Sequence, residues 1–296
     1  MENKLSVIII TYNMGHMIGR ALESLRAQTA KDFDVVIIDN HSTDNTREII
    51  KQFDDLKVAF WEIKNNGILS KSRNLGVSKA KGNWISFLDA DDYWEKNKVK
   101  KITKIIDIID NSFVAISHRC YVENHVTGNK KMIKWNIPGK NLHKQLILGK
   151  NPFCLTGTVV RKTALMSAGG FSEKPEYKTV EDYELWIRLS ACGNFYCIDD
   201  PLATIVLHEG NYSRKANIQM HALDIMKRYY LDSDIGINTN ERRKAYIALY
   251  ELETRCLQKN GFFSEAILIG QKAMREHIFS LKIFVILCLA KFKIPN

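Results

Sequence analysis

Four strand patterns alternate with helical patterns in the first ninety residues of the chain. Leu5–Thr11 and Phe33–Ile38 are continuous β-branched and apolar runs, as expected for parallel strands that are covered on both faces. Two further runs follow at Val58–Ile63 and Trp84–Leu88. The helical patterns between these runs cover residues 15–28, 46–53 and 71–80. The alternation predicts an α/β fold with a doubly wound, mostly parallel sheet.

The remaining sequence predicts more elements and a change of character near residue 214. Helices are predicted at 99–110 and 180–192, strands at 113–122 and 155–161, and an irregular basic loop over the site at 124–150. Beyond residue 214 the pattern is helical, with a helical hairpin at 245–258 and 264–276. We therefore expect one domain over residues 1–213 and a C-terminal helical extension over 214–296.

The chain is basic, with 43 Lys and Arg against 33 Asp and Glu and a formal charge of +10. Such an excess favours an anionic partner, namely nucleic acid, a membrane face or a phosphate-bearing substrate, although a basic surface without a dedicated partner is the alternative. No nucleic-acid-binding motif occurs, so no nucleic-acid partner is predicted. The six cysteines form no CxxC pair, which favours free thiols in a reducing compartment. No signal peptide or membrane-spanning run is recognised, and a cytoplasmic location is predicted.

Polar residues follow three of the predicted strands. They are Thr11-Tyr12-Asn13, the run from Asp39 to Asp44, and the run from Asp89 to Asp92. Ligands of doubly wound sheets bind beyond the carboxyl ends of the strands, so these clusters should converge on one crevice. Ser42 and Thr43 lie just before the helix that follows the second cluster, and either could help to cap its start.

The acidic run Asp89-Ala90-Asp91-Asp92 favours a metal site. Three carboxylates in four residues repel one another unless a cation lies between them, and oxygen ligands suit Mg²⁺ or Mn²⁺. An acidic turn that caps the next helix is the alternative, but the position at a strand end favours the metal. Neither GxGxxG nor a P-loop motif is present, so a divalent ion is the expected means of neutralising phosphate charge.

A second acidic pair, Glu181-Asp182, opens a predicted amphipathic helix. Carboxylates at that position favour the helix dipole, which is sufficient reason for their presence. One of them could also serve as the base that deprotonates an attacking hydroxyl.

Five segments occur in an order that resembles a known family. They are Val7–Asn13, Asp39–Asp44, Asn66-Gly67 with Arg73–Gly76, Phe87–Trp94, and Glu181-Asp182 with Leu185-Trp186. Together they are similar to the family 2 inverting glycosyltransferases of bacterial surface-polysaccharide type, which have the type-A nucleotide-diphospho-sugar transferase fold. The resemblance covers roughly residues 4–213.

The resemblance implies a role for each matching residue. The residues implied for nucleotide binding are Thr11, Tyr12, Asp39, Asn40, Arg73 and Asp89. Asp91 would be the principal ligand of Mn²⁺ or Mg²⁺, and His208 would approach the metal and the diphosphate, although a lone histidine is more often structural. Asp182 would be the catalytic base.

Two positions depart from the family pattern. Ile10 replaces a usual proline, and Asn40 stands where a second aspartate is common. An asparagine can accept the imide hydrogen of uracil only through its carbonyl oxygen. A UDP-sugar is the favoured donor, with dTDP- and GDP-sugars as alternatives.

The expected activity is transfer of a hexosyl or N-acetylhexosaminyl group from a nucleotide-sugar donor to a glycan or lipid-linked acceptor. A non-catalytic scaffold on the same fold is the alternative, and a nucleotidyltransferase is disfavoured because no glycine-rich basic loop follows the first strand.

The apolar run Leu281–Lys293 is too short to span a bilayer and favours either the cytoplasmic membrane face or a protein contact. The sequence leaves the oligomeric state open.

Overall fold

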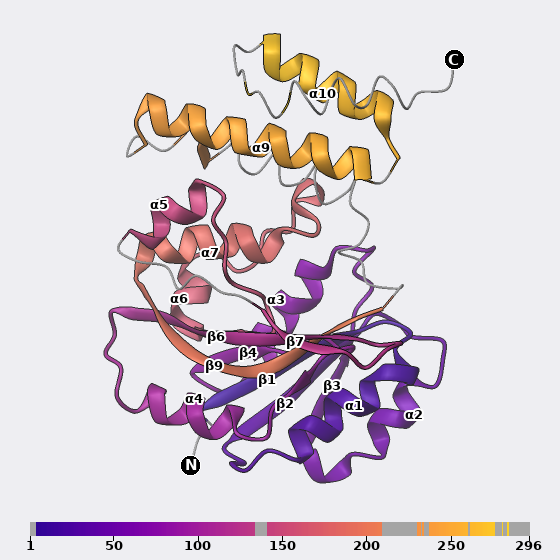
Figure 1. Cartoon of the computed structure of the whole chain (residues 1–296). Helices are drawn as coiled ribbons and strands as arrows, with labels where there is room; N and C mark the ends of the chain where they lie inside the picture. The colour runs from indigo at the N-terminus through magenta and orange to yellow at the C-terminus, as the bar shows by residue number, and fades with distance from the viewer. Residues whose placement is uncertain are drawn as a thin grey trace. The chain divides into compact units, whose positions relative to one another are not determined.

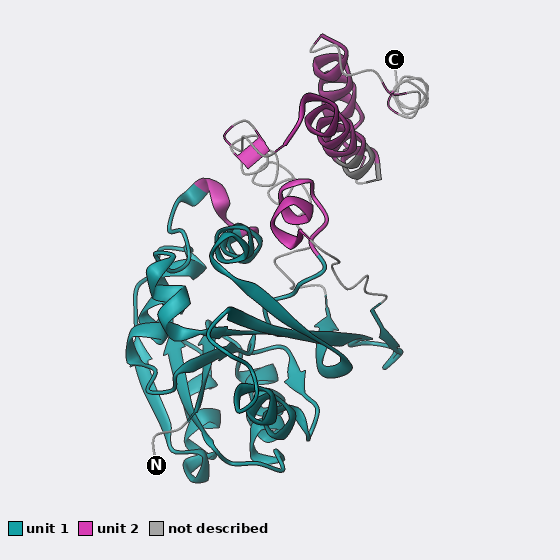
Figure 2. Ribbon diagram, turned by 90° about the vertical axis from the view of Figure 1, so that its left-hand side faces the viewer, with its two compact units in different colours: residues 1–137, 152–175, 181–209 teal, residues 138–151, 176–180, 210–296 magenta. Residues whose placement is uncertain are grey.

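The computed structural model describes residues 4–133, 141–208, 230–231, 233, 237–259, 261–275, 280 and 283. The chain divides into two compact units (Figure 2). The first contains residues 1–137, 152–175 and 181–209, and the second contains 138–151, 176–180 and 210–296. The domain boundary predicted after residue 213 lies outside the described residues.

The first unit is built on one curled sheet (Figure 1). Its strands are β1 (Leu5–Thr11), β2 (Phe33–Asp39), β3 (Val58–Glu62), β4 (Trp84–Phe87), β5 (Tyr93–Trp94), β6 (Phe113–Asn124), β7 (Lys130–Met132), β8 (Thr158–Arg161) and β9 (Asn194–Leu207). The order is β3-β2-β1-β4-β8-β6-β9-β5, with β7 paired to β6. The four predicted strands β1 to β4 are confirmed and run parallel. Beyond β4 the sheet is mixed, since β8 runs antiparallel to both β4 and β6.

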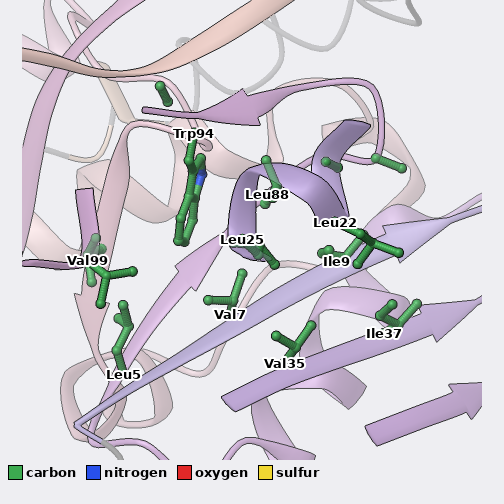
Figure 3. Packing of buried hydrophobic residues seen from close by; sticks show 14 of the residues in the cluster. Leu5, Val7, Ile9, Leu22, Leu25, Val35, Ile37, Leu88, Trp94 and Val99 are labelled. Carbon is green, nitrogen blue, oxygen red and sulfur yellow. The ribbon is translucent and has the colours of Figure 1, made fainter. Parts of the chain in front are cut away.

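Helix α1 (Gly15–Arg26) covers one face of the parallel strands (Figure 3). The buried residues on this face include Val7, Ile9, Leu22, Leu25, Val35 and Ile37. Burying a side chain of this size contributes about 1.5–3 kcal/mol, so this layer supplies much of the stability of the unit. The helical spacing of the apolar residues in α1 is therefore explained by one buried stripe.

Helix α3 (Leu69–Lys79) packs on the opposite face of the same strands. A Cβ atom at Gly76 would lie 2.5 Å from Cγ2 of Ile8 and 3.4 Å from Cγ1 of Ile38, so glycine permits the close approach of helix and sheet. Ile8 and Ile38 alternate with the residues that face α1. Helices on both faces confirm the doubly wound α/β class.

The other helices complete the two units. In the first they are α2 (Thr46–Lys51), η1 (Asp54–Leu56), α4 (Lys98–Ile106), α6 (Lys162–Ser167) and α7 (Glu181–Cys192). In the second they are α5 (Leu142–Ile147), α9 (Thr239–Lys259) and α10 (Phe263–Arg275), and η2 (Pro175–Tyr177) lies at the boundary. The predicted hairpin is confirmed by α9 and α10, which pack around Tyr250 and Ala273. None of the described helices combines the length and hydrophobicity needed to cross a bilayer.

Two predictions required correction. Residues 124–150 are not one irregular loop, because Lys130–Met132 pairs with β6 and Leu142–Ile147 is helical. The strand β9 was absent from the prediction, although with 14 residues it is the longest described strand and pairs with β6 along most of its length. Most of the apolar tail at 281–293 lies outside the described residues.

Candidate functional site

Three strand ends bring the polar clusters to one edge of the sheet. Thr11 at the end of β1 is in register with Asp39 at the end of β2. On the other side of β1, Ile8 is in register with Phe87, the last residue of β4. The segments that begin at residues 11, 39 and 89 therefore leave the same carboxyl edge, as predicted.

Asp39 organises the loop after β2. Its carboxylate is buried and accepts hydrogen bonds from the N–H and the hydroxyl of Ser42, at 2.9 and 2.5 Å. Ser42 Oγ in turn accepts the N–H of Asn13 at 2.8 Å, which joins the loops after β1 and β2. The predicted cap role of Ser42 or Thr43 is wrong, because the first helical N–H of α2, at Thr46, is bonded to Asp44 at 3.0 Å.

Thr11, Tyr12 and Asn40 lie beside this loop. The hydroxyl of Thr11 is buried and has no hydrogen-bond partner among the described residues, whereas the ring of Tyr12 is 55% exposed. Asn40 Oδ1 accepts the N–H of Asn65 at 2.9 Å. That bond directs the amide nitrogen of Asn40 away from Asn65 and orients the side chain.

The carboxylates of the acidic run Asp89–Asp92, called the acidic motif from here on, have different surroundings. Asp92 is buried, and its Oδ1 accepts the N–H of Val206 in β9 at 3.0 Å. Asp91 Oδ2 lies 2.9 Å from Nε2 of His208, the residue that follows β9. His208 is brought to Asp91 by the antiparallel pairing of β5 with β9, in which Tyr93 is in register with Thr204.

Two carboxyl groups of the motif, Asp89 and Asp92, have raised pKa values, mainly because of burial. Burial, followed by the charges of Asp89 and Asp91, raises the pKa of Asp92 well above its usual range. Burial also raises the pKa of Asp89 to about 6, and Asp91 and Glu181 add to the rise while Arg73 opposes it. The motif therefore carries a repulsion that a bound cation would relieve.

Asp91 and His208 fit a divalent ion in the type and placement of their donor atoms. A carboxylate oxygen and an imidazole nitrogen 2.9 Å apart are ligands that Mn²⁺ accepts. Within the part of the chain that the structure describes, no three His, Cys, Asp or Glu side chains form a complete ligand group. An ion at this place would accordingly take further ligands from a substrate diphosphate and from water.

A buried ion pair connects the acidic motif to α7. Arg73 of α3 donates from Nη1 to Oε1 of Glu181, and both side chains are 7% exposed. Arg73 Nη2 also lies 3.7 Å from Oδ1 of Asp89. Glu181 Oε2 has no hydrogen-bond partner among the described residues. The helix-dipole interpretation of Glu181 missed this pair, because its partner is 108 positions away in the sequence.

Asp182 follows Glu181 and is partly buried. Burial, followed by the charge of Glu181, raises the pKa of Asp182 to about 7. Its Oδ1 accepts the N–H of Tyr183 at 2.7 Å. A carboxyl group with this pKa exchanges a proton at neutral pH, which suits general base catalysis.

The chain is similar throughout its length to bacterial glycosyltransferases. It is 28% identical to the amylovoran biosynthesis glycosyltransferase AmsB of Erwinia amylovora over 286 residues, which are 92% of each chain. It is 27% identical to WfgD of Escherichia coli over 194 residues, with 66% of this chain and 72% of that protein covered. WfgD is named a UDP-Glc:alpha-D-GlcNAc-diphosphoundecaprenol beta-1,3-glucosyltransferase.

Solved structures share the fold, among them two that match almost all of this chain. Staphylococcus aureus TarS 1–349 in complex with UDP-GlcNAc superposes with a TM-score of 0.65 at 20% identity, over 97% of this chain and 79% of that one. The mannosyltransferase PcManGT of Pyrobaculum calidifontis in complex with GDP-Man and Mn²⁺ gives a TM-score of 0.62 at 16% identity, over 99% and 80%. The fold is that of the type-A nucleotide-sugar transferases.

The sequence profile of Glycosyl transferase family 2 matches residues 6–168, which is more than half of the chain. This range contains the three strand ends and the acidic motif. The protein therefore belongs to glycosyl transferase family 2.

Proposed function

We propose that the protein transfers a hexosyl or N-acetylhexosaminyl group, with inversion, from a nucleotide-diphosphate sugar to a hydroxyl of a glycan or lipid-linked acceptor in surface-polysaccharide synthesis. The observation that supports this most is the link between Asp182 and the acidic motif. Asp182 has a pKa of about 7 and adjoins Glu181, which is bonded to Arg73, and Arg73 also lies beside Asp89. A base for the acceptor and a site for the donor are thus joined by one buried ion pair.

The loops after β1 and β2 would hold the nucleoside, and UDP is the favoured carrier. The exposed ring of Tyr12 suits contact with a base, and the unpaired hydroxyl of Thr11 offers a buried polar group to the donor. Asp39 and Asn40 would also face the base. Their bonds to Ser42 and Asn65 hold both side chains in place from the side away from the base. Arg73 would lie near the sugar diphosphate.

Asp91 and His208 would hold Mn²⁺ or Mg²⁺, and Asp89 would approach the ribose and the metal. A bound divalent ion would supply Lewis acid stabilisation of the negative charge that develops on the leaving diphosphate. The donor atoms of Asp91 and His208 already lie together at the carboxyl edge of the sheet. Asp92 would hold the motif against β9 through its bond to Val206.

Asp182 would remove the proton from the attacking hydroxyl. The acceptor oxygen forms a bond to the anomeric carbon as the bond from that carbon to the diphosphate oxygen breaks. The bonding electrons leave with the nucleoside diphosphate, and the proton passes to Asp182. Attack on the face opposite the leaving group inverts the anomeric centre.

The names of two relatives support this acceptor class. AmsB is named for amylovoran biosynthesis, and WfgD is named for transfer to a diphosphoundecaprenol-linked sugar. Residues 1–213 would form the catalytic domain. The helical extension at 214–296 would contribute to acceptor choice and, through its apolar tail, to contact with the cytoplasmic face of the inner membrane.

The proposal is tested by measuring donor binding and hydrolysis with UDP-, dTDP- and GDP-sugars in Mn²⁺, Mg²⁺ or EDTA. We expect one donor to be selected in a metal-dependent way, and Asp91→Ala to abolish the selection. Absence of binding to every donor under every metal condition would instead favour a scaffold on the same fold.

A further inference from the structure

One face of α1 is bonded to the segment that carries the acidic motif. Ser24 Oγ accepts the N–H of Trp94 at 3.1 Å. One turn later, just beyond the end of α1, Gln28 donates to the carbonyl of Glu95 and accepts the N–H of Val99, both at 3.0 Å. These bonds go to main-chain atoms, so they fix the path of the segment without engaging the carboxylates of the motif.

Arg20 lies one turn before Ser24 and continues this row to Asp91 itself. Its Nη2 donates to the main-chain carbonyl of Asp91 at 3.2 Å, and its Nη1 donates to Oε1 of Glu123 at 3.1 Å. The guanidinium carbon lies 4.8 Å from the centre of the Tyr93 ring. The hydroxyl of Tyr93 donates to Oε2 of Glu123 at 2.6 Å, which closes the group of three side chains.

This closed group restricts where the guanidinium can lie. Glu123 belongs to β6 and Tyr93 to β5, and both strands pair with β9, which ends beside His208. Glu123 is in register with Val206, the residue whose N–H binds Asp92. Arg20 is thereby held by the same strands that place the two candidate metal ligands.

We propose that Arg20 is a positioning residue for the metal site. By holding the carbonyl of Asp91 against Glu123 and Tyr93, it fixes the main chain from which the Asp91 carboxylate extends toward His208. The inference rests on the proposed function, in which Asp91 and His208 bind the divalent ion. Loss of the guanidinium should weaken metal binding because Asp91 must then be ordered at the moment of binding.

The same helix supplies a matched control. Arg26 donates from Nε and Nη2 to Asp55, and from Nη2 to the carbonyl of Gln52 at 3.1 Å. Its guanidinium carbon lies 4.3 Å from the centre of the Phe53 ring. The side chains of Arg20 and Arg26 are 37% and 36% exposed. Arg26 therefore has the same kinds of partner as Arg20, without a contact to the acidic motif.

The test compares Mn²⁺ binding to the full chain in five proteins: wild type, Arg20→Met, Arg20→Lys, Arg26→Met and Asp91→Ala. Binding is measured by titration without donor or acceptor, and thermal midpoints report any loss of fold. We expect Arg20→Met to raise the Kd for Mn²⁺ about tenfold, the equivalent of one hydrogen bond. Arg26→Met should lower the thermal midpoint about as much as Arg20→Met does, but it should leave the Kd for Mn²⁺ unchanged. Arg20→Lys should recover part of the affinity because an ammonium can still donate to the Asp91 carbonyl.

Activity measured against Mn²⁺ concentration completes the test. If Arg20 acts through Asp91, excess Mn²⁺ should restore the kcat of Arg20→Met. A kcat that stays low at saturating Mn²⁺ would mean that Arg20 contacts the substrate directly, and would overturn the positioning role. Equal Mn²⁺ affinity of Arg20→Met and Arg26→Met would also overturn it. If Asp91→Ala binds Mn²⁺ as wild type does, the proposed metal site itself fails, which is a distinguishable result.

Discussion

Arg73 of α3 and Glu181 of α7 form a buried ion pair between two helices of the first unit. The pair lies between Asp89, which Arg73 approaches at 3.7 Å, and Asp182, which directly follows Glu181. Arg73 lowers the pKa of both aspartates, while Glu181 raises it. The protonation of the proposed base therefore depends on whether Glu181 is charged.

The first prediction concerns pH. Because only deprotonated Asp182 can accept a proton, kcat/KM should rise with pH through about 7 and fall at lower pH. Glu181→Gln removes a negative charge beside Asp182 and leaves the charge of Arg73, so the pKa of Asp182 should fall. The acidic limb of the profile should consequently move to lower pH, which a pH series of initial rates would detect.

A control for this prediction lies one turn further along α7. Glu184 is buried and pairs with Arg188 in the same helix. Glu184→Gln removes a buried carboxylate of the same size and should leave the acidic limb in place. Equal shifts in the two variants, or a shift of Glu181→Gln toward higher pH, would contradict the electrostatic account.

A second prediction separates binding from chemistry. Asp182→Asn preserves the size of the side chain and its bond to the N–H of Tyr183, but it cannot accept the acceptor proton. Removal of a general base costs about 10²–10⁴ in rate, so kcat should fall by that range. The Kd for the donor, measured by titration, should stay within about twofold of wild type. A large loss of donor affinity would place Asp182 in donor binding instead.

A third prediction distinguishes two neighbours in the acidic motif. Asp91→Ala should abolish Mn²⁺ binding with little change in stability, because Asp91 lies toward His208 at the edge of the site. Asp92→Ala should reduce the free energy of unfolding by about 1–3 kcal/mol, since it removes the buried carboxylate that accepts the N–H of Val206. Urea unfolding and metal titration of both variants would show this contrast. Equal effects of the two substitutions on both measurements would refute the division of roles.

The strands that carry the polar clusters could be predicted because each strand is recognisable from its own local sequence. Leu5–Thr11 and Phe33–Asp39 are β-branched runs that are buried on both faces, and each ends at its polar cluster. No distant partner needs to be known to recognise them. The convergence of the clusters then follows from the parallel arrangement of the strands.

The features that the sequence did not predict, namely strand β9 and the side-chain bonds of Arg73 and Arg20, depend on contacts between distant segments. Asp199-Asp200-Pro201 is typical of a turn, which hides the continuity of β9 in the sequence. In the structure His118 is in register with Ile198 and Arg119 with Pro201, so two residues of β9 bulge out of the pairing. Asp199 binds Arg119 there at 2.5 Å. The bonds from Arg73 to Glu181 and from Arg20 to Asp91 likewise join residues whose local patterns have sufficient separate explanations.

A fourth prediction concerns selection of the nucleobase. Asn40 Oδ1 already accepts the N–H of Asn65, so the amide nitrogen is the group left for a ligand. Asn40→Asp keeps an acceptor for Asn65 and replaces that donor by a second acceptor, which suits the imide N–H of uracil. UDP should bind several-fold more tightly to this variant while GDP does not, as measured by competition. Weaker UDP binding would mean that Asn40 donates to a base carbonyl.

A fifth prediction concerns Lys98, which is fully buried at the start of α4. Its ammonium donates to the carbonyl of Thr156 at 2.6 Å and lies 3.8 Å from the centre of the Trp94 ring. Burial lowers the pKa of Lys98 to about 7, whereas an unfolded chain keeps a lysine near 10.4. Between these values the unfolded state binds more protons, so the contribution of Lys98 to stability should improve as pH rises.

Lys98→Met removes this dependence of stability on pH, and it also removes the ammonium that donates to the carbonyl of Thr156. The stability of the variant relative to wild type should be highest near pH 6 and should decline by about 1 kcal/mol per pH unit from pH 7 to 10. Lys101→Met, which alters an exposed lysine of the same helix that pairs with Asp200, should follow wild type at every pH. Urea unfolding at pH 6, 7, 8 and 9 measures the difference. Parallel curves for wild type and Lys98→Met would mean that Lys98 keeps its ordinary pKa in the core, and the ammonium would then be stabilised there by Thr156 and Trp94.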